Sequence, residues 1–131
     1  MWYDNLDGNK FLISLYDTVP DLNDVRVEEL SILREGYDIK LLFDMPRFAD
    51  NVPQKWLKAG SNVVVVELLF GDIYNLKIHS KKLSLCRGDI KIFKDNDGKI
   101  IFVLRGSICC EFAAEFGMVK RVSSYIVKSD E

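Results

Sequence analysis

The chain lacks an excess of charge of either sign. Among its 131 residues, 18 lysines and arginines stand against 20 aspartates and glutamates, which gives a formal net charge of −2. A nucleic-acid-binding domain usually carries a clear basic excess on its surface. We therefore expect no nucleic-acid partner.

Cysteines and long apolar runs are also scarce. The three cysteines, Cys86, Cys109 and Cys110, are odd in number, and the adjacent pair is not a Cys-x-x-Cys redox motif. The N-terminal "MWYDNLDGNK" has no basic stretch followed by an apolar one, and no apolar run is long enough to span a bilayer. These absences predict a protein of the reducing cytoplasm, with no signal peptide and no membrane partner.

Catalytic and metal-binding patterns are missing as well. His79 is the single histidine, and on its predicted strand it alternates outward with Lys77, as a surface residue would. The "DNDG" at residues 95–98 does not fit a calcium loop, because the ligand positions would fall on Phe93 and Leu104. We expect no enzymatic activity, no metal and no cofactor.

What the sequence does have is an ordinary globular composition, with 48% hydrophobic and 29% charged residues. A chain of this length and composition can bury a core without disulfides or metals. We expect one domain covering residues 1–131.

Hydrophobic periodicity predicts one helix and several strands. Phe11, Leu12, Leu15 and Tyr16 recur at helical spacing, and Pro20 follows the helix. The rest alternates as strands over residues 24–33, 37–44, 63–70, 73–80, 89–94, 99–105, 107–116 and 118–127, with a break at Gly71–Asp72, a bulge at Glu28–Glu29 and a loop over residues 45–60. Tyr74, Leu76 and Ile78 are predicted to share one face, and Ile108, Cys110, Phe112 and Ala114 to point inward.

Short connections between these strands imply antiparallel neighbours. The predicted class is α+β and predominantly antiparallel β. It has seven or eight strands in a curved meander or in two layers, and one short N-terminal helix.

Acidic residues on the predicted strands form the candidate binding surface. Asp38 and Asp44 share the polar face of one strand, Glu67 interrupts an apolar strand, and Glu111 lies on the outer face of another. They form either a solvated sheet face or an anionic patch for a basic partner, recognised by charge complementarity.

Trp56 raises a second question, because it is a large aromatic residue in a polar loop marked by Pro53. It either offers an exposed ring to a partner or anchors the loop on the sheet.

Short motifs give the chain a resemblance to the Immunity protein 50 family of bacterial polymorphic-toxin systems. They are Trp2-Tyr3, "VPDL" at residues 19–22, "LLFDMP" at residues 41–46, "PQKW" at residues 53–56, then Gly60, Asn62 and the strand ending at Phe70. The resemblance spans most of the chain and is densest in its first half. It favours Trp56 as an anchor.

The resemblance implies a protein that binds and neutralises one cognate toxin C-terminal domain, often a nuclease. It brings no catalytic residues with it. Against a nuclease, Asp38, Asp44, Glu67 and Glu111 would mimic the phosphates of the substrate. Two other classes stay open, a small-molecule binding module with a ligand held in a curved sheet, and an enzyme with two carboxylates facing one cleft. The oligomeric state is left open.

Overall fold

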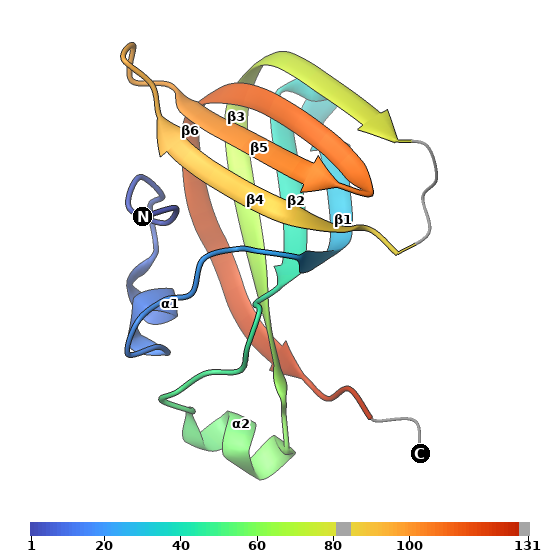
Figure 1. Cartoon of the computed structure of the whole chain (residues 1–131). Helices are drawn as coiled ribbons and strands as arrows, with labels where there is room; N and C mark the ends of the chain where they lie inside the picture. Colours follow the sequence, from blue (N-terminus) through green and yellow to red (C-terminus); the bar gives the residue numbers. More distant parts are fainter. Residues whose placement is uncertain (81–84, 129–131) are drawn as a thin grey trace.

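The computed structural model describes residues 1–80 and 85–128, and Figure 1 labels its elements. The described residues form two short α-helices, one 3₁₀ turn and six strands. In chain order these are α1 (Lys10–Ser14), β1 (Val25–Leu33), η1 (Arg34–Gly36), β2 (Asp38–Asp44), α2 (Gln54–Ala59), β3 (Val63–Ser80), β4 (Arg87–Lys94), β5 (Ile100–Gly106) and β6 (Ile108–Tyr125).

The six strands form a closed barrel in the order β1-β2-β3-β6-β5-β4. Every pair of neighbouring strands is antiparallel. The seam between β1 and β4 has only two residue pairs, with Val25 opposite Gly88 and Arg26 opposite Arg87. The predicted α+β class, mostly antiparallel β with an N-terminal helix, is confirmed.

The number of strands differs from the predicted seven or eight, because β3 and β6 each join two predicted strands. The chain bends at Gly71–Asp72 without leaving the sheet, and Asp72 has a φ of 55°. The missing side chain of Gly71 makes room for the Phe116 ring, whose Cζ would lie 2.0 Å from a Cβ placed there. In Figure 1 the upper half of β3 arches over one end of the barrel.

Alternating side chains fill the barrel interior. The predicted inward residues Ile108, Cys110, Phe112 and Ala114 are all buried. The Phe112 ring stacks on Phe102 at 4.9 Å between centroids and lies 5.1 Å from Phe70. Each such ring removed from water contributes roughly 1.5–3 kcal/mol to stability. Side chains therefore occupy the space where a curved-sheet binding module would hold its ligand.

The prediction that Tyr74, Leu76 and Ile78 share one face of the strand is wrong. Tyr74 lies opposite Ala113 and Ile78 opposite Cys110, and the register shifts between Tyr74 and Lys77. The extra residue in β3 places Tyr74 and Ile78 on opposite faces of the sheet. The bulge predicted at Glu28–Glu29 is present, as a register shift between Val27 and Glu29.

The N-terminal segment packs against the barrel. Leu12, Leu15 and Tyr16 are buried as the helical spacing predicted, whereas Phe11 is 46% exposed. The Trp2 indole Nε1–H donates to the Pro20 carbonyl at 3.0 Å, which holds the two ends of this segment together.

Residues 45–60 are not a simple loop, because they contain α2. Gly60, with a φ of 71°, ends this helix in the left-handed conformation that glycine adopts readily. On α2, the half-buried Trp56 lies edge-on to Phe11 at 5.8 Å and tilted against Phe48 at 6.3 Å between centroids. These ring contacts anchor α2 to the N-terminal segment and to the loop before α2, whereas the sequence predicted an anchor on the sheet.

No helix in the described part of the chain has the length and apolar character needed to cross a bilayer.

Candidate functional site

Asp44, at the end of β2, belongs to a network inside the chain. Its Oδ2 accepts a hydrogen bond from the Tyr125 hydroxyl at 2.5 Å and lies 3.4 Å from Nη1 of Arg26, which also pairs with Glu28. Burial, followed by the hydrogen bond to Asp44, raises the pKa of Tyr125 to about 12. The carboxylate is only 14% exposed and links β1, β2 and β6.

Asp38, at the start of β2, is also largely withdrawn from solvent. Its side chain is 11% exposed, and Oδ2 accepts a hydrogen bond from Nη1 of Arg34 at 3.3 Å. The Arg34 guanidinium also lies over the Tyr37 ring, 5.9 Å from its centroid. Asp38 therefore orients an exposed arginine at the tip of the β1–β2 hairpin.

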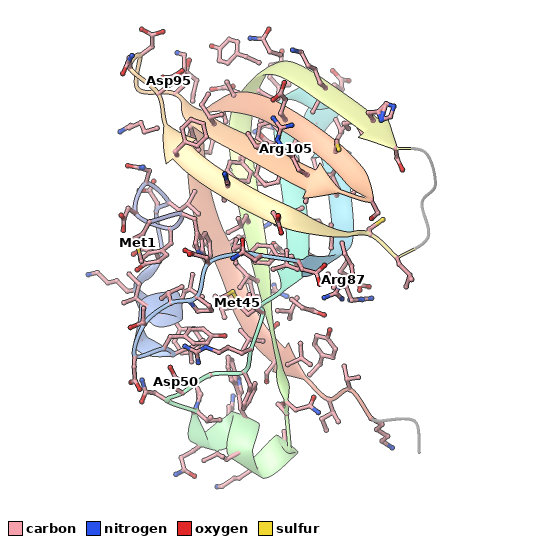
Figure 2. All side chains as sticks on the ribbon, viewed as in Figure 1. Met1, Met45, Asp50, Arg87, Asp95 and Arg105 are labelled. Atoms are coloured by element: carbon pink, nitrogen blue, oxygen red, sulfur yellow. The ribbon has the colours of Figure 1, made fainter. Side chains whose placement is uncertain are left out.

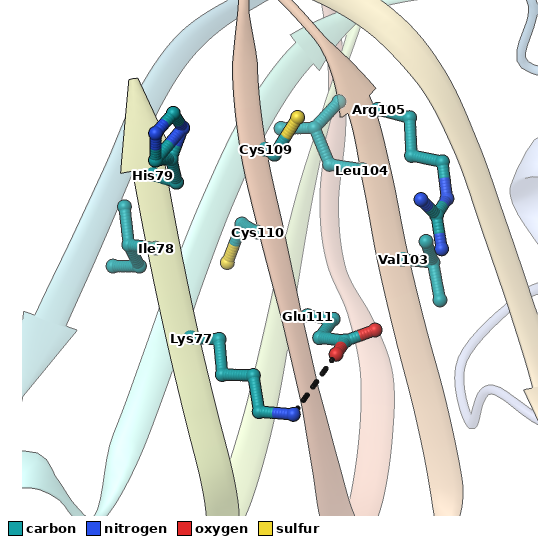
Figure 3. A pocket seen from close by; sticks show the side chains of 9 residues that line it. All are labelled: Lys77, Ile78, His79, Val103, Leu104, Arg105, Cys109, Cys110 and Glu111. Atoms are coloured by element: carbon teal, nitrogen blue, oxygen red, sulfur yellow. Dashed lines mark ion pairs between the residues drawn. The ribbon is translucent and has the colours of Figure 1, made fainter. Parts of the chain in front are cut away.

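Glu67 and Glu111 each pair with a lysine across β3 and β6. Glu67 is 15% exposed and lies 3.7 Å from Nζ of Lys120. Glu111 is 44% exposed and lies 3.5 Å from Nζ of Lys77, as the dashed line in Figure 3 shows. Glu111 is the most accessible of the four predicted contact residues.

The structure does not gather the four carboxylates into one patch. Asp38 and Asp44 occupy opposite ends of β2, and Glu67 lies opposite Leu42 on that strand, whereas Glu111 lies opposite Lys77 in the upper half of β3. Each has a cationic partner within the chain. Contact between these residues and a toxin stays a prediction.

A hollow of about 200 Å³ lies around the upper ends of β3, β6 and β5. His79 lies opposite Cys109 in the register, and both are exposed (Figure 3). The prediction of His79 as a surface residue is thereby confirmed. The Cys109 thiol makes its hydrogen bond with the Gly106 carbonyl at 3.8 Å, not with His79. Burial raises the pKa of the neighbouring Cys110 thiol to about 11, so that thiol is a poor nucleophile.

Metal binding finds no support here either. Within residues 1–80 and 85–128, no three histidine, cysteine, aspartate or glutamate side chains lie close enough together to hold an ion.

A second hollow, of about 380 Å³, lies at the seam of the barrel. Arg26 and Arg87 face each other there, with Asp24, Asp44 and Met45 around them (Arg87 and Met45 are labelled in Figure 2). Arg87 Nε donates to Asp24 at 3.1 Å, and its Nη2 donates to the Asp24 carbonyl at 2.7 Å. The acids thus offset the repulsion that two arginines in register would otherwise create.

A third hollow, of about 300 Å³, lies between the tip of the β1–β2 hairpin and the bend of β3. We call it the tip hollow; it is lined by Glu35, Gly36, Tyr37, Asp72, Ile73 and Tyr74. Tyr37 is 58% and Tyr74 46% exposed. Glu35 and Asp72 make no ion pair with any other described residue.

Neighbouring charges fix the position of Tyr74 at the tip hollow. Its hydroxyl donates to Oε1 of Glu115 at 2.8 Å, and Nζ of Lys99 donates to the same oxygen at 2.6 Å. The bond to Glu115 is the main cause that raises the pKa of Tyr74, and the bond from Lys99 the main cause that lowers the pKa of Glu115.

Sequence reasoning missed the tip hollow. The sequence shows a turn signal, "REG" at residues 34–36, and a break signal at Gly71–Asp72, but only the pairing of Asp38 with Gly71 brings the two side by side.

The chain was compared with known protein families, curated proteins and solved structures. The family model described as Immunity protein 50 matches residues 8–125, which include every strand of the barrel. No curated protein and no solved structure gives a significant match to the chain.

Proposed function

The chain belongs to the Immunity protein 50 family, and we propose that it binds and neutralises one cognate bacterial toxin domain. The observation that carries this proposal is the family match over residues 8–125. Residues 1–131 act as a single domain in the cytoplasm, where a toxin delivered into the cell would meet it.

Neutralisation is by binding and not by chemistry on the toxin. The geometry of Cys109 and His79 supports this proposal, because no hydrogen bond links the thiol to the imidazole as a nucleophile and its base require. The protein blocks the active site of the toxin or the path of its substrate.

A nuclease is the proposed target. Its phosphate-binding groove would be basic, so carboxylates of the immunity protein would take the place of substrate phosphates. Asp38, Asp44, Glu67 and Glu111 are the proposed contacts. Glu111 is favoured because it is 44% exposed, against 15% or less for the side chains of the other three.

Co-expression tests the function. The toxin domain encoded immediately upstream is induced in cells with and without this chain, and survival is counted. The protein should restore growth, and a toxin domain from an unrelated locus should kill in its presence. Equal death with and without the protein would refute the proposal.

A further inference from the structure

One stretch of β3 is exposed on both faces. Each of residues 74–79 is exposed, including the apolar side chains of Tyr74, Leu76 and Ile78, at 46%, 36% and 47%. From Val64 to Phe70, by contrast, buried and half-buried residues alternate. Because Tyr74 and Ile78 lie on opposite faces, apolar side chains meet solvent on both sides of this stretch, which marks a surface that another molecule covers.

The same stretch has a free edge. The pairing of β2 with β3 ends at Asp38 opposite Gly71, and beyond this point β6 is the only described strand that pairs with β3. Within residues 1–80 and 85–128, the backbone N–H and C=O groups on the other edge of this stretch have no strand partner. A long exposed edge with apolar side chains is a template for pairing with another chain.

We propose that residues 74–79 receive an extended segment of the cognate toxin domain, which adds a strand to the free edge of β3. This inference rests on the proposed function and gives it a contact surface. Backbone hydrogen bonds supply part of the affinity, and alternate side chains supply specificity. Leu76 and Ile78 contact apolar side chains of the incoming strand.

The charge of the tip hollow favours a basic residue at one position of the incoming toxin strand. The hollow adjoins the first residue of the exposed stretch, and its carboxylates, Glu35 and Asp72, make no ion pair with a described residue. The rings of Tyr37 and Tyr74 lie beside them, and each already has a cation of this chain over it, Arg34 at 5.9 Å and Lys99 at 5.3 Å from the ring centroid. An arginine or lysine of the toxin fits the two carboxylates by charge.

A second copy of this chain fits the same edge poorly. The bulge between Tyr74 and Lys77, with Asn75 at a φ of 55°, and the 75% exposed Lys77 both lie in the centre of the stretch. A bulge and an edge lysine oppose pairing with any strand, and between two copies of this chain both edges would carry them, which doubles the opposition. An antiparallel self-pairing would also bring the two lysines together.

Binding of the full chain to the upstream toxin domain tests this surface. Leu76→Lys and Ile78→Lys should each weaken binding roughly 30-fold or more, the effect of losing a central interface side chain. The matched control is Leu57→Lys, at a position on α2 that is 58% exposed. It should change affinity by less than about twofold, because exposed substitutions outside an interface have small effects.

Hydrogen exchange of the wild-type pair supplies a readout that does not depend on how the variants fold. Amides in residues 73–80 should exchange more slowly in the complex than in the free protein. Unchanged exchange there, or unchanged affinity in folded Leu76→Lys and Ile78→Lys variants, overturns the strand addition while the proposed function stands. Self-association of the free chain through this edge, seen by light scattering and abolished by Ile78→Lys, also overturns it. A wild-type protein that does not bind the toxin refutes both.

Discussion

Asn62 and Val127 exchange two hydrogen bonds at the lower end of the long β3–β6 ribbon. Asn62 Nδ2 donates to the Val127 carbonyl at 2.9 Å, and the Val127 amide donates to Asn62 Oδ1 at 2.8 Å. The backbone N–H of Asn62 also donates to the Tyr125 carbonyl at 3.0 Å. One side chain thus mimics a further backbone pair and holds the chain after β6 against the start of β3.

Replacing Asn62 by alanine should remove both side-chain hydrogen bonds. We expect Asn62→Ala to lower the free energy of unfolding by about 1 kcal/mol, since each such bond contributes little when exposed. Denaturant unfolding measures the change, and Lys55→Ala on the exposed side of α2 is the control. Equal stability of wild type and Asn62→Ala would show that the two hydrogen bonds between Asn62 and Val127 do not stabilise the fold.

Trp56→Phe tests the anchor. The indole bridges α2 to Phe11 and Phe48, so a smaller ring should reduce the free energy of unfolding by about 1–2 kcal/mol, the range for a partial loss of aromatic packing. Leu57→Ala, next to it and 58% exposed, should cost far less. Toxin affinity should stay near that of wild type. A fully stable Trp56→Phe protein that no longer binds the toxin would make Trp56 an interface residue.

Gly106 and Gly71 both lie where another part of the chain comes too close for a Cβ, which allows their alanine variants to be compared. A Cβ on Gly106 would lie 2.0 Å from the Arg87 carbonyl oxygen, a backbone atom beside the seam. A Cβ on Gly71 would meet the tip of the Phe116 ring, which is 45% exposed and can turn away. Gly106→Ala should therefore cost about 2 kcal/mol or more of unfolding free energy, and Gly71→Ala clearly less. Thermal and denaturant unfolding compare the two, and the reverse order would contradict this explanation of the seam.

Two tyrosines should resist ionisation. Burial raises the pKa of Tyr16 and of Tyr125 to about 12, from 10.0 in the unfolded chain. Because the folded pKa is the higher one, both groups favour folding at full strength below pH 10.0, and this contribution is lost as the pH rises from there towards about 12.

Ultraviolet absorbance of tyrosinate, measured as the pH is raised, follows the ionisation of Tyr16 and Tyr125 directly. Tyr16→Phe and Tyr125→Phe should each remove one late-titrating group and make stability less sensitive to alkaline pH. Tyr37→Phe, which removes a 58% exposed ring, is the control and should leave both late groups. If neither Tyr16→Phe nor Tyr125→Phe reduces the tyrosine ionisation that occurs above pH 10.0, the burial of these hydroxyls is contradicted.

Sequence reasoning predicted the parts of the fold that depend on local alternation. Ile108, Cys110, Phe112 and Ala114 are buried because alternate residues of a strand point to one face. The helix α2 was missed because "QKWLKA" is too short to show a helical period.

The remaining differences arise from pairing between distant residues. Gly71–Asp72 looks like a break, and only the continued register with β6 shows that β3 passes through it. The barrel closes where Arg26 lies opposite Arg87, and no local sequence pattern predicts a contact between residues so far apart in the chain.

The candidate site was predictable in kind and not in arrangement. The sequence identifies Glu111 as an outward acid, but the lysine that partly neutralises it, Lys77, is set by the register of β3 against β6. The free edge of residues 74–79 depends likewise on where β2 stops pairing, at Asp38.

Direct titration of the purified chain with the toxin domain encoded immediately upstream tests the central claim. We expect a saturable one-to-one complex with a nanomolar or lower dissociation constant, and loss of toxin activity in step with occupancy. A toxin domain from an unrelated locus should not bind. Absence of binding, or binding that leaves the toxin fully active, would contradict the conclusion that this protein is an immunity protein for that toxin.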